Sequence, residues 1–189
     1  TIARLTHQSW WWQTIHALFS PLAWGFSTLS IAPIWFLLAY ILLFLVYRGA
    51  LSGQLPLYLS NKATAATLAT LVANDPNLRF IDLGAGIGSV IRALAKALPA
   101  AQFTGIENAP ATWAIGYLHT AGFKNCHWYW ADIWRTNLAD YDVVYAFLSP
   151  TPMAALWEKA LREMRPGSIL ISNTFEVLGV DSTRIIDVG

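Results

Sequence analysis

Charge is the scarcest property of this 189-residue chain, and it is unevenly distributed. Only 12% of the residues are charged, the formal net charge is +1, and the first 60 residues contain just Arg4 and Arg48. A nucleic-acid partner calls for a clustered basic surface, so this composition argues against DNA or RNA. The distribution instead indicates an apolar leader joined to one ordinary domain.

Cysteine and histidine are also sparse. Cys126 is alone, so no internal disulfide can form, which fits a reducing compartment. The chain opens with Thr1 rather than methionine, so we expect a processed N-terminus. The four histidines lie far apart in the sequence, and we expect no metal site from them: His7, His16, His119 and His127.

Residues 1–48 have the composition of a membrane anchor. The tryptophans at 10–12 suit the membrane interface, although an aromatic patch packed on the domain is the alternative. The stretch 22–47 is uncharged, and at about 1.5 Å per residue it could cross a hydrocarbon core of about 30 Å. A cleaved signal peptide is the rival, but its apolar part is usually about 7–15 residues long. We therefore predict one transmembrane helix ending before Arg48, in contact with the bilayer, in which Pro33 either makes a kink or marks the start of the regular part.

A linker and a single domain are predicted after the anchor. Residues 49–60 contain Gly53 and Pro56 and are typical of a linker to a domain over 61–189. Within that domain, apolar runs of strand length alternate with helical patterns. This alternation predicts an α/β fold, a Rossmann-like and mostly parallel sheet with helices on both faces. One more short strand is expected over 184–188.

A glycine-rich turn follows the first predicted strand, and the pattern becomes helical at Ser89. Gly84, Gly86 and Gly88 alternate there; glycine tolerates positive φ, and a helix start offers free N–H groups to a ligand. Glu107 ends the next strand, where a carboxylate could accept hydrogen bonds from both ribose hydroxyls of a nucleoside. The two features together predict a nucleoside-binding corner.

The spacing of this turn separates three kinds of nucleotide site. A P-loop would require a lysine that is missing here, and a dinucleotide fingerprint would require glycine where Ser89 stands. The pattern D-x-G-x-G-x-G from Asp82 to Gly88 instead resembles motif I of the class I S-adenosylmethionine-dependent methyltransferases. The likeness covers roughly residues 75–175 and implies S-adenosyl-L-methionine as the cofactor.

That resemblance also implies roles for particular residues. Asp82 would position the glycine loop and the methionine amine, Glu107 would bind the ribose, and Asp132 with Ile133 would meet the adenine amine. The plainer alternatives are that Asp82 only holds backbone amides and that Asp132 is a turn residue at a strand end. Trp134 has two possible roles, stacking on the adenine or packing in the core.

The segment 141–175 resembles more closely the membrane-anchored protein-lysine methyltransferases, a group that includes the mitochondrial ATP synthase c-subunit lysine methyltransferase and its prokaryotic relatives. Its apolar strand ends in a proline turn, which makes Phe147, Ser149 and Pro150 the substrate-facing candidates, although the last two could form only a turn. Leu148-Ser149-Pro150 replaces the Asn/Asp-Pro-Pro-Tyr motif of many amino-group methyltransferases. Backbone carbonyls would then hold the amine, and we expect Tyr145, Phe147 and Phe175 to line an apolar mouth.

The resemblance implies an enzyme that methylates a lysine amine of a membrane-associated protein, with its domain in the cytoplasm, where the cofactor is made. No catalytic triad is expected, because alignment of the nucleophile with an electrophilic methyl is most of the chemistry. Two alternatives stay open: a methyltransferase for a lipid or quinone-like small molecule, and a non-catalytic S-adenosylmethionine-binding module. The family's sheet closes with a hairpin of which 184–188 would supply one strand, so we expect a truncated C-terminus.

Overall fold

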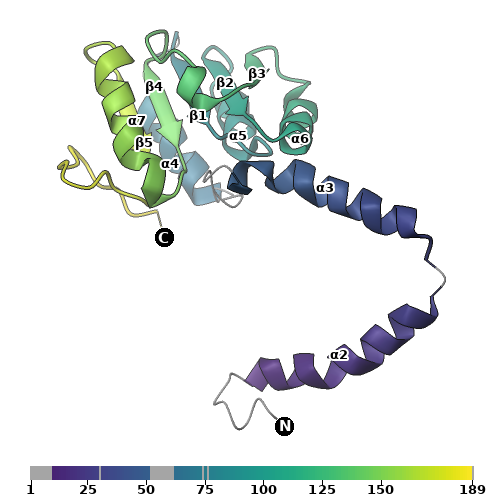
Figure 1. Cartoon of the computed structure of the whole chain (residues 1–189). Helices are drawn as coiled ribbons and strands as arrows, with labels where there is room; N and C mark the ends of the chain where they lie inside the picture. The colour runs from purple at the N-terminus through teal and green to yellow at the C-terminus, as the bar shows by residue number, and fades with distance from the viewer. Residues whose placement is uncertain (1–9, 30, 52–61, 74, 76, 189) are drawn as a thin grey trace. The chain divides into compact units, whose positions relative to one another are not determined.

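The structure is a computed structural model in which residues 10–29, 31–51, 62–73, 75 and 77–188 are described (Figure 1). Contacts within the chain divide it into two compact units, Thr1–Ile41 and Leu42–Gly189. The first unit is helical, and the second contains the sheet.

Two helices, not one, occupy the part of the apolar leader that the structure describes. Helix α2 spans Trp10–Thr28 and helix α3 spans Pro33–Leu51. The predicted transmembrane helix over 22–47 is therefore wrong in its bounds, because the helical hydrogen bonding stops before Pro33. Proline has no N–H to donate and its ring clashes with the carbonyl four residues earlier, so it begins a helix far better than it continues one.

Among the described residues, we find no helix that combines the length and the apolar character needed to cross a bilayer. Helix α3 also runs into the segment that was predicted to be a linker, since it continues through Leu51. The remainder of that segment, 52–60, lies outside the described residues, as does the N-terminal part of the leader at 1–9. The linker stays a prediction.

The second unit is built on a five-stranded sheet with the strand order β3-β2-β1-β4-β5. All four strand pairs are parallel, with Asp82 of β1 opposite Gly105 of β2 and Tyr145 of β4. The predicted α/β fold with a parallel sheet is confirmed. Its strands are β1 (Arg79–Leu83), β2 (Gln102–Glu107), β3 (Cys126–Trp130), β4 (Val143–Ala146) and β5 (Ile169–Ser172).

Helices cover both faces of this sheet, as predicted (Figure 1). Side chains alternate along β1, so Phe80 packs into a core cluster with α4 and α5, while Ile81 packs into a second cluster with α7. Helix α5 buries Val90, Ile91 and Leu94 on one stripe, which holds it against the sheet. The helices are α4 (Lys62–Val72), α5 (Ser89–Ala97), α6 (Pro110–Thr120) and α7 (Pro150–Glu163).

The chain after β5 has no regular secondary structure. Residues 173–188 form bends and turns, so the strand predicted over 184–188 is absent from the described residues. Within the segment 184–188, Ile185 is 77% exposed and does not enter the core. A strand without a ladder partner has no hydrogen bonds to keep it extended, and the alternation of residues alone does not supply them.

Candidate functional site

The turn after β1 has the backbone conformation that its glycines predict. Gly84, Gly86 and Gly88 all have positive φ, at 80°, 57° and 79°. The N–H groups of Gly84 and Ala85 both donate to the carbonyl of Ile106, each at 2.9 Å. The turn therefore bends from the end of β1 toward the end of β2, which residues with a Cβ could follow only with strain.

Gly88 serves packing as well as conformation. It is the N-cap of α5, and no side chain caps that helix end. A Cβ at Gly88 would lie 2.7 Å from the Trp128 ring, and one at Gly116 would lie 2.4 Å from it. A Cβ at Gly105 of β2 would lie 3.0 Å from the same ring and 2.8 Å from Ile91. Trp128 thus occupies a slot formed by three glycines, so the third glycine of the motif has a structural reason that sequence reasoning missed.

The Glu107 carboxylate ties the glycine turn to the loop after β2. One oxygen accepts the N–H of Gly86 at 3.0 Å, and the other accepts the N–H of Ala109 at 2.8 Å. The residue is only 9% exposed, and burial raises the pKa of Glu107 above its usual value, although these backbone N–H groups oppose the change. The backbone N–H of Asn108 also bonds to this carboxylate, and lone-pair capacity remains beyond these three donors for a further one.

Asp82 is a buried carboxyl group in the middle of the site. It is 4% exposed, and we find no hydrogen bond to its side chain within the described part of the chain. Burial, and then the nearby charge of Glu107, raise the pKa of Asp82 to about 8. The plainer prediction was that Asp82 holds backbone amides. Glu107 has that role instead. The Asp82 carboxyl group therefore remains available to a charged donor.

Asp132 shapes the turn after β3. Its side-chain oxygen Oδ1 accepts the N–H of Trp134 at 3.0 Å, capping the short 3-10 helix η1 (Ile133–Arg135). Ile133 is buried in the core cluster beneath α7, and Trp134 packs against the same cluster. The structural role predicted for Asp132 as a turn residue is confirmed; one carboxylate oxygen remains beyond that bond.

The turn after β4 contains no glycine. Strand β4 ends at Ala146, Phe147 is half-buried against the α4–α5 cluster, and Leu148 is buried on the other side. Ser149 is the N-cap of α7 with no side-chain capping bond, and Pro150 begins the helix. The expectation that Tyr145 lines a mouth is wrong, because its side chain is 1% exposed and its ring stacks on Phe80 within the core.

Sequence reasoning named Phe175 but overlooked Asn173 and Thr174, the two residues directly after β5. The N–H of Asn173 donates to the carbonyl of Ala146 at 2.9 Å, which places Asn173 beside the end of β4. Thr174 has φ of 71°, a conformation that a β-branched residue adopts only with strain. Phe175 packs against the α7 cluster. An asparagine directly after a strand was visible in the sequence, and it was passed over because no motif includes it.

Comparison with known proteins identifies a family. The family model described as the ANTKMT methyltransferase domain matches residues 82–184, more than half of the chain. No curated protein matches the sequence. The matched segment begins at Asp82, so it contains the glycine turn and every site residue described above.

Solved structures show the same fold. An RNA methyltransferase from Salinibacter ruber in complex with S-adenosyl-L-homocysteine is 20% identical, with a TM-score of 0.65 over 69% of this chain and 86% of that one. A SAM-dependent methyltransferase from Geobacter sulfurreducens, also with S-adenosyl-L-homocysteine, is 21% identical, with a TM-score of 0.52 over 59% and 47% of the two chains. A precorrin-6y C5,15-methyltransferase from Geobacter metallireducens GS-15 is 16% identical, with a TM-score of 0.51 over 60% and 63%. At these identities the likeness establishes the fold alone.

Proposed function

The chain belongs to the family of ANTKMT methyltransferase domains, and from that premise we propose that it methylates a lysine amine of a membrane-associated protein. S-Adenosyl-L-methionine is the cofactor, and methyl transfer is the class of reaction. The observation that carries the proposal is the buried Asp82 carboxyl group, which lacks a hydrogen-bond partner within the described residues and stands beside the glycine turn.

The site fits this cofactor group by group. Asp82 would receive the ammonium of the methionine part, which supplies the positive charge that its buried carboxylate lacks. Glu107 would accept the ribose hydroxyls with the lone-pair capacity that the backbone N–H groups leave free. Asp132 would accept the adenine amine with its second oxygen, and the uncapped start of α5 adds N–H groups.

The protein's part in the transfer is alignment. When bound, S-adenosylmethionine supplies a methyl group already activated by its sulfonium sulfur. A lysine nitrogen must arrive neutral and in line with that methyl, which an apolar approach favours because desolvation lowers the pKa of an amine. Phe147 would provide this apolar wall. The backbone carbonyls near Phe147 and Ser149, together with the nearby side-chain amide of Asn173, would orient the nitrogen.

The proposal of a membrane-associated location rests on the apolar leader. Every residue from 34 to 44 of α3 is exposed, so apolar side chains face outward around the whole circumference of that part of the helix. An exposed apolar surface of this extent typically binds a membrane or a protein. We propose that α2 and α3 lie in contact with the bilayer on the cytoplasmic side, where the cofactor is made. The KMT in the name of the matching family, for lysine methyltransferase, supports the acceptor.

One experiment separates the possible acceptors. The full chain in its native membranes is incubated with radiolabelled S-adenosylmethionine, and protein is then separated from lipid. We expect label in protein, present as methyllysine by mass spectrometry. Label in a lipid or quinone fraction would replace the lysine acceptor with a small molecule. Cofactor binding without label anywhere would identify a non-catalytic module.

A matched pair of glycine variants is the control for this experiment. Gly86→Val should abolish cofactor binding and labelling, because the side chain fills the space beside the cofactor. Gly167→Val carries the same backbone strain, with φ of 90° in the wild type, but nothing lies within 4 Å of a Cβ at Gly167. Labelling should therefore survive in Gly167→Val. Loss in both variants would point to misfolding rather than to the site.

A further inference from the structure

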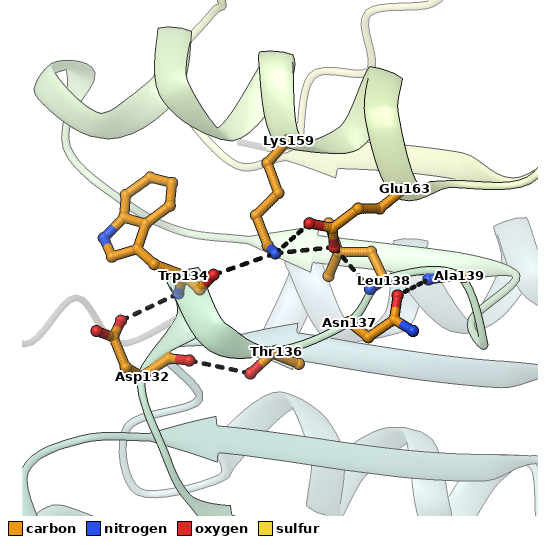
Figure 2. A network of polar contacts seen from close by, with 8 residues as sticks. All are labelled: Asp132, Trp134, Thr136, Asn137, Leu138, Ala139, Lys159 and Glu163. Atoms are coloured by element: carbon orange, nitrogen blue, oxygen red, sulfur yellow. Dashed lines mark hydrogen bonds and ion pairs between the residues drawn. The ribbon is translucent and has the colours of Figure 1, made fainter.

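An ion pair on α7, between a buried lysine and a partly exposed glutamate, holds the turn that follows β3. Lys159 is 4% exposed, and its Nζ donates to both carboxylate oxygens of Glu163, at 2.7 and 2.8 Å. The same Nζ donates to the carbonyl of Trp134 at 3.3 Å. Figure 2 shows the lysine reaching down from α7 to this carbonyl. The pair thus joins α7 to a residue 25 positions earlier in the sequence.

The other half of the pair holds the far end of the same turn. The Glu163 oxygen Oε2 accepts the N–H of Leu138 at 3.1 Å (Figure 2). Within the turn, Thr136 donates its hydroxyl to the carbonyl of Asp132 at 3.1 Å. Backbone groups at Trp134 and Leu138 are therefore both fixed from outside the turn, and Asp132 is fixed from within it.

Stability alone does not explain an ion pair in this position. Forming this pair costs the full desolvation of the Lys159 ammonium and part of that of Glu163, whose side chain is 27% exposed, and apolar residues of similar size usually stabilise a fold as well or better. Although burial raises the pKa of Glu163, the hydrogen bonds from Lys159 and Leu138 outweigh it and hold the pKa below its ordinary value. What apolar residues could not do is bond to the carbonyl of Trp134 and the N–H of Leu138.

We propose that Lys159 and Glu163 are positioning residues that hold the 132–138 turn in the shape that recognises the adenine amine of the cofactor. The inference rests on the proposed function, since it assigns the second oxygen of Asp132 to that amine. Asp132 Oδ1 is already bonded to the N–H of Trp134, so the direction of its other oxygen follows the position of Trp134. Lys159 sets that position through the Trp134 carbonyl.

The test compares a charge-free variant with a matched control. Lys159→Met alone would leave the partly exposed Glu163 carboxylate without its partner and could destabilise the chain, so the main variant is Lys159→Met/Glu163→Leu, which removes both charges. Arg165→Met is the control, because it removes an exposed ion pair of 2.7 Å with Asp142 at the opposite end of the sheet. Thermal unfolding identifies the variants that fold.

Two ligands report on the adenine contact. Calorimetry measures binding of S-adenosylhomocysteine and of its inosine analogue, in which an oxygen replaces the adenine amine. We expect the double variant to bind S-adenosylhomocysteine about tenfold more weakly and to lose most of the wild-type preference for it over the analogue. Hydrogen exchange should also accelerate at the Trp134 and Leu138 amides. Arg165→Met should match the wild type in all three measurements.

The outcomes separate this inference from the proposed function. A folded double variant with wild-type preference and wild-type exchange would overturn the positioning role while leaving the methyltransferase intact. Equal loss of affinity for both ligands, with unchanged exchange at the turn, would overturn it too, because the effect would not involve the adenine amine. A wild-type protein that binds neither ligand would remove the proposed function, and this inference with it.

Discussion

Two turns leave the same edge of the sheet, after β1 and after β4, and they are built in different ways. The first is made of backbone, with three glycines of positive φ and N–H groups bonded to Ile106 and Glu107. The second is made of side chains, with Phe147 and Leu148 packed on opposite faces and an uncapped Ser149. A turn made of backbone limits which ligands can approach it, whereas one made of side chains offers mainly shape and polarity. The turn after β1 therefore indicates which cofactor binds, whereas the turn after β4 does not indicate which methyl acceptor binds.

The largest expected effect tests the Asp82 carboxyl group, which is buried in β1 just before the first turn. The pKa of Asp82 rises from 3.8 to about 8 on folding, so between these values the folded protein keeps a proton that the unfolded chain has lost. Stability should then fall as pH rises from 5 to 8, on the order of 1.4 kcal/mol per unit. Urea unfolding across this range measures it, and Asp82→Asn should flatten the curve. The same slope in both proteins would contradict the assignment.

A smaller loss is expected when the glycine slot is filled. Gly88→Ala places a methyl group against Trp128 at a positive φ, and the combined strain and overpacking should cost about 2–4 kcal/mol of unfolding free energy. Gly179→Ala is the matched control, since its φ of 78° is close to the 79° of Gly88 and nothing lies within 4 Å of its Cβ. Equal stability of the two variants would show that the ring has room to move.

Removal of the Glu107 carboxylate should weaken binding of the cofactor. Glu107→Ala should weaken binding of S-adenosylhomocysteine by about 1–3 kcal/mol, through the lost hydrogen bonds to the ribose and to Gly86. Asp75→Ala removes a carboxylate that accepts a backbone N–H, from Asn77, on the opposite edge of the sheet. Calorimetry should find its affinity unchanged. Equal affinity in Glu107→Ala would mean that the ribose is bound elsewhere.

The smallest effect should sharpen the contrast between the two turns. Phe147→Ala should lower methyl transfer about tenfold, or 1.4 kcal/mol, and leave cofactor affinity nearly intact, because only the second turn changes. Leu178→Ala, at a side chain that is 89% exposed, is the control. Parallel transfer and binding assays decide the matter. A loss of cofactor affinity equal to the loss of transfer would place Phe147 in the cofactor site instead.

The sequence was most informative where local chemistry decides the structure. Gly84, Gly86 and Gly88 predicted a left-handed turn, and alternating elements predicted the parallel sheet, because both depend on residues close in sequence. The bond from Lys159 to Trp134 could not be predicted, since it joins two segments that only the folded sheet brings together. The placement of Tyr145 failed because nearness to a strand end does not determine the face to which a side chain points.

The leader shows another limit of sequence reasoning. Its lack of charge suggested one continuous helix, yet helix α2 ends at Thr28 and helix α3 begins at Pro33. Hydropathy averages over a window and does not register one missing N–H group. A proline in the middle of an apolar run is therefore better read as the start of a helix than as a defect in one.

The slot around Trp128 has a consequence for how this domain could vary over time. Gly88, Gly105 and Gly116 come from three different elements, yet all three are kept small by the same indole ring. In a suppressor screen, a deleterious Gly116→Ala should be rescued by a smaller residue at position 128 more often than by changes anywhere else. Once that residue has shrunk, selection against alanine should relax at Gly105 more than at Gly88, whose φ of 79° strains any side chain. The four positions would then drift as a group, and part of a motif associated with the cofactor would vary for reasons unrelated to the cofactor.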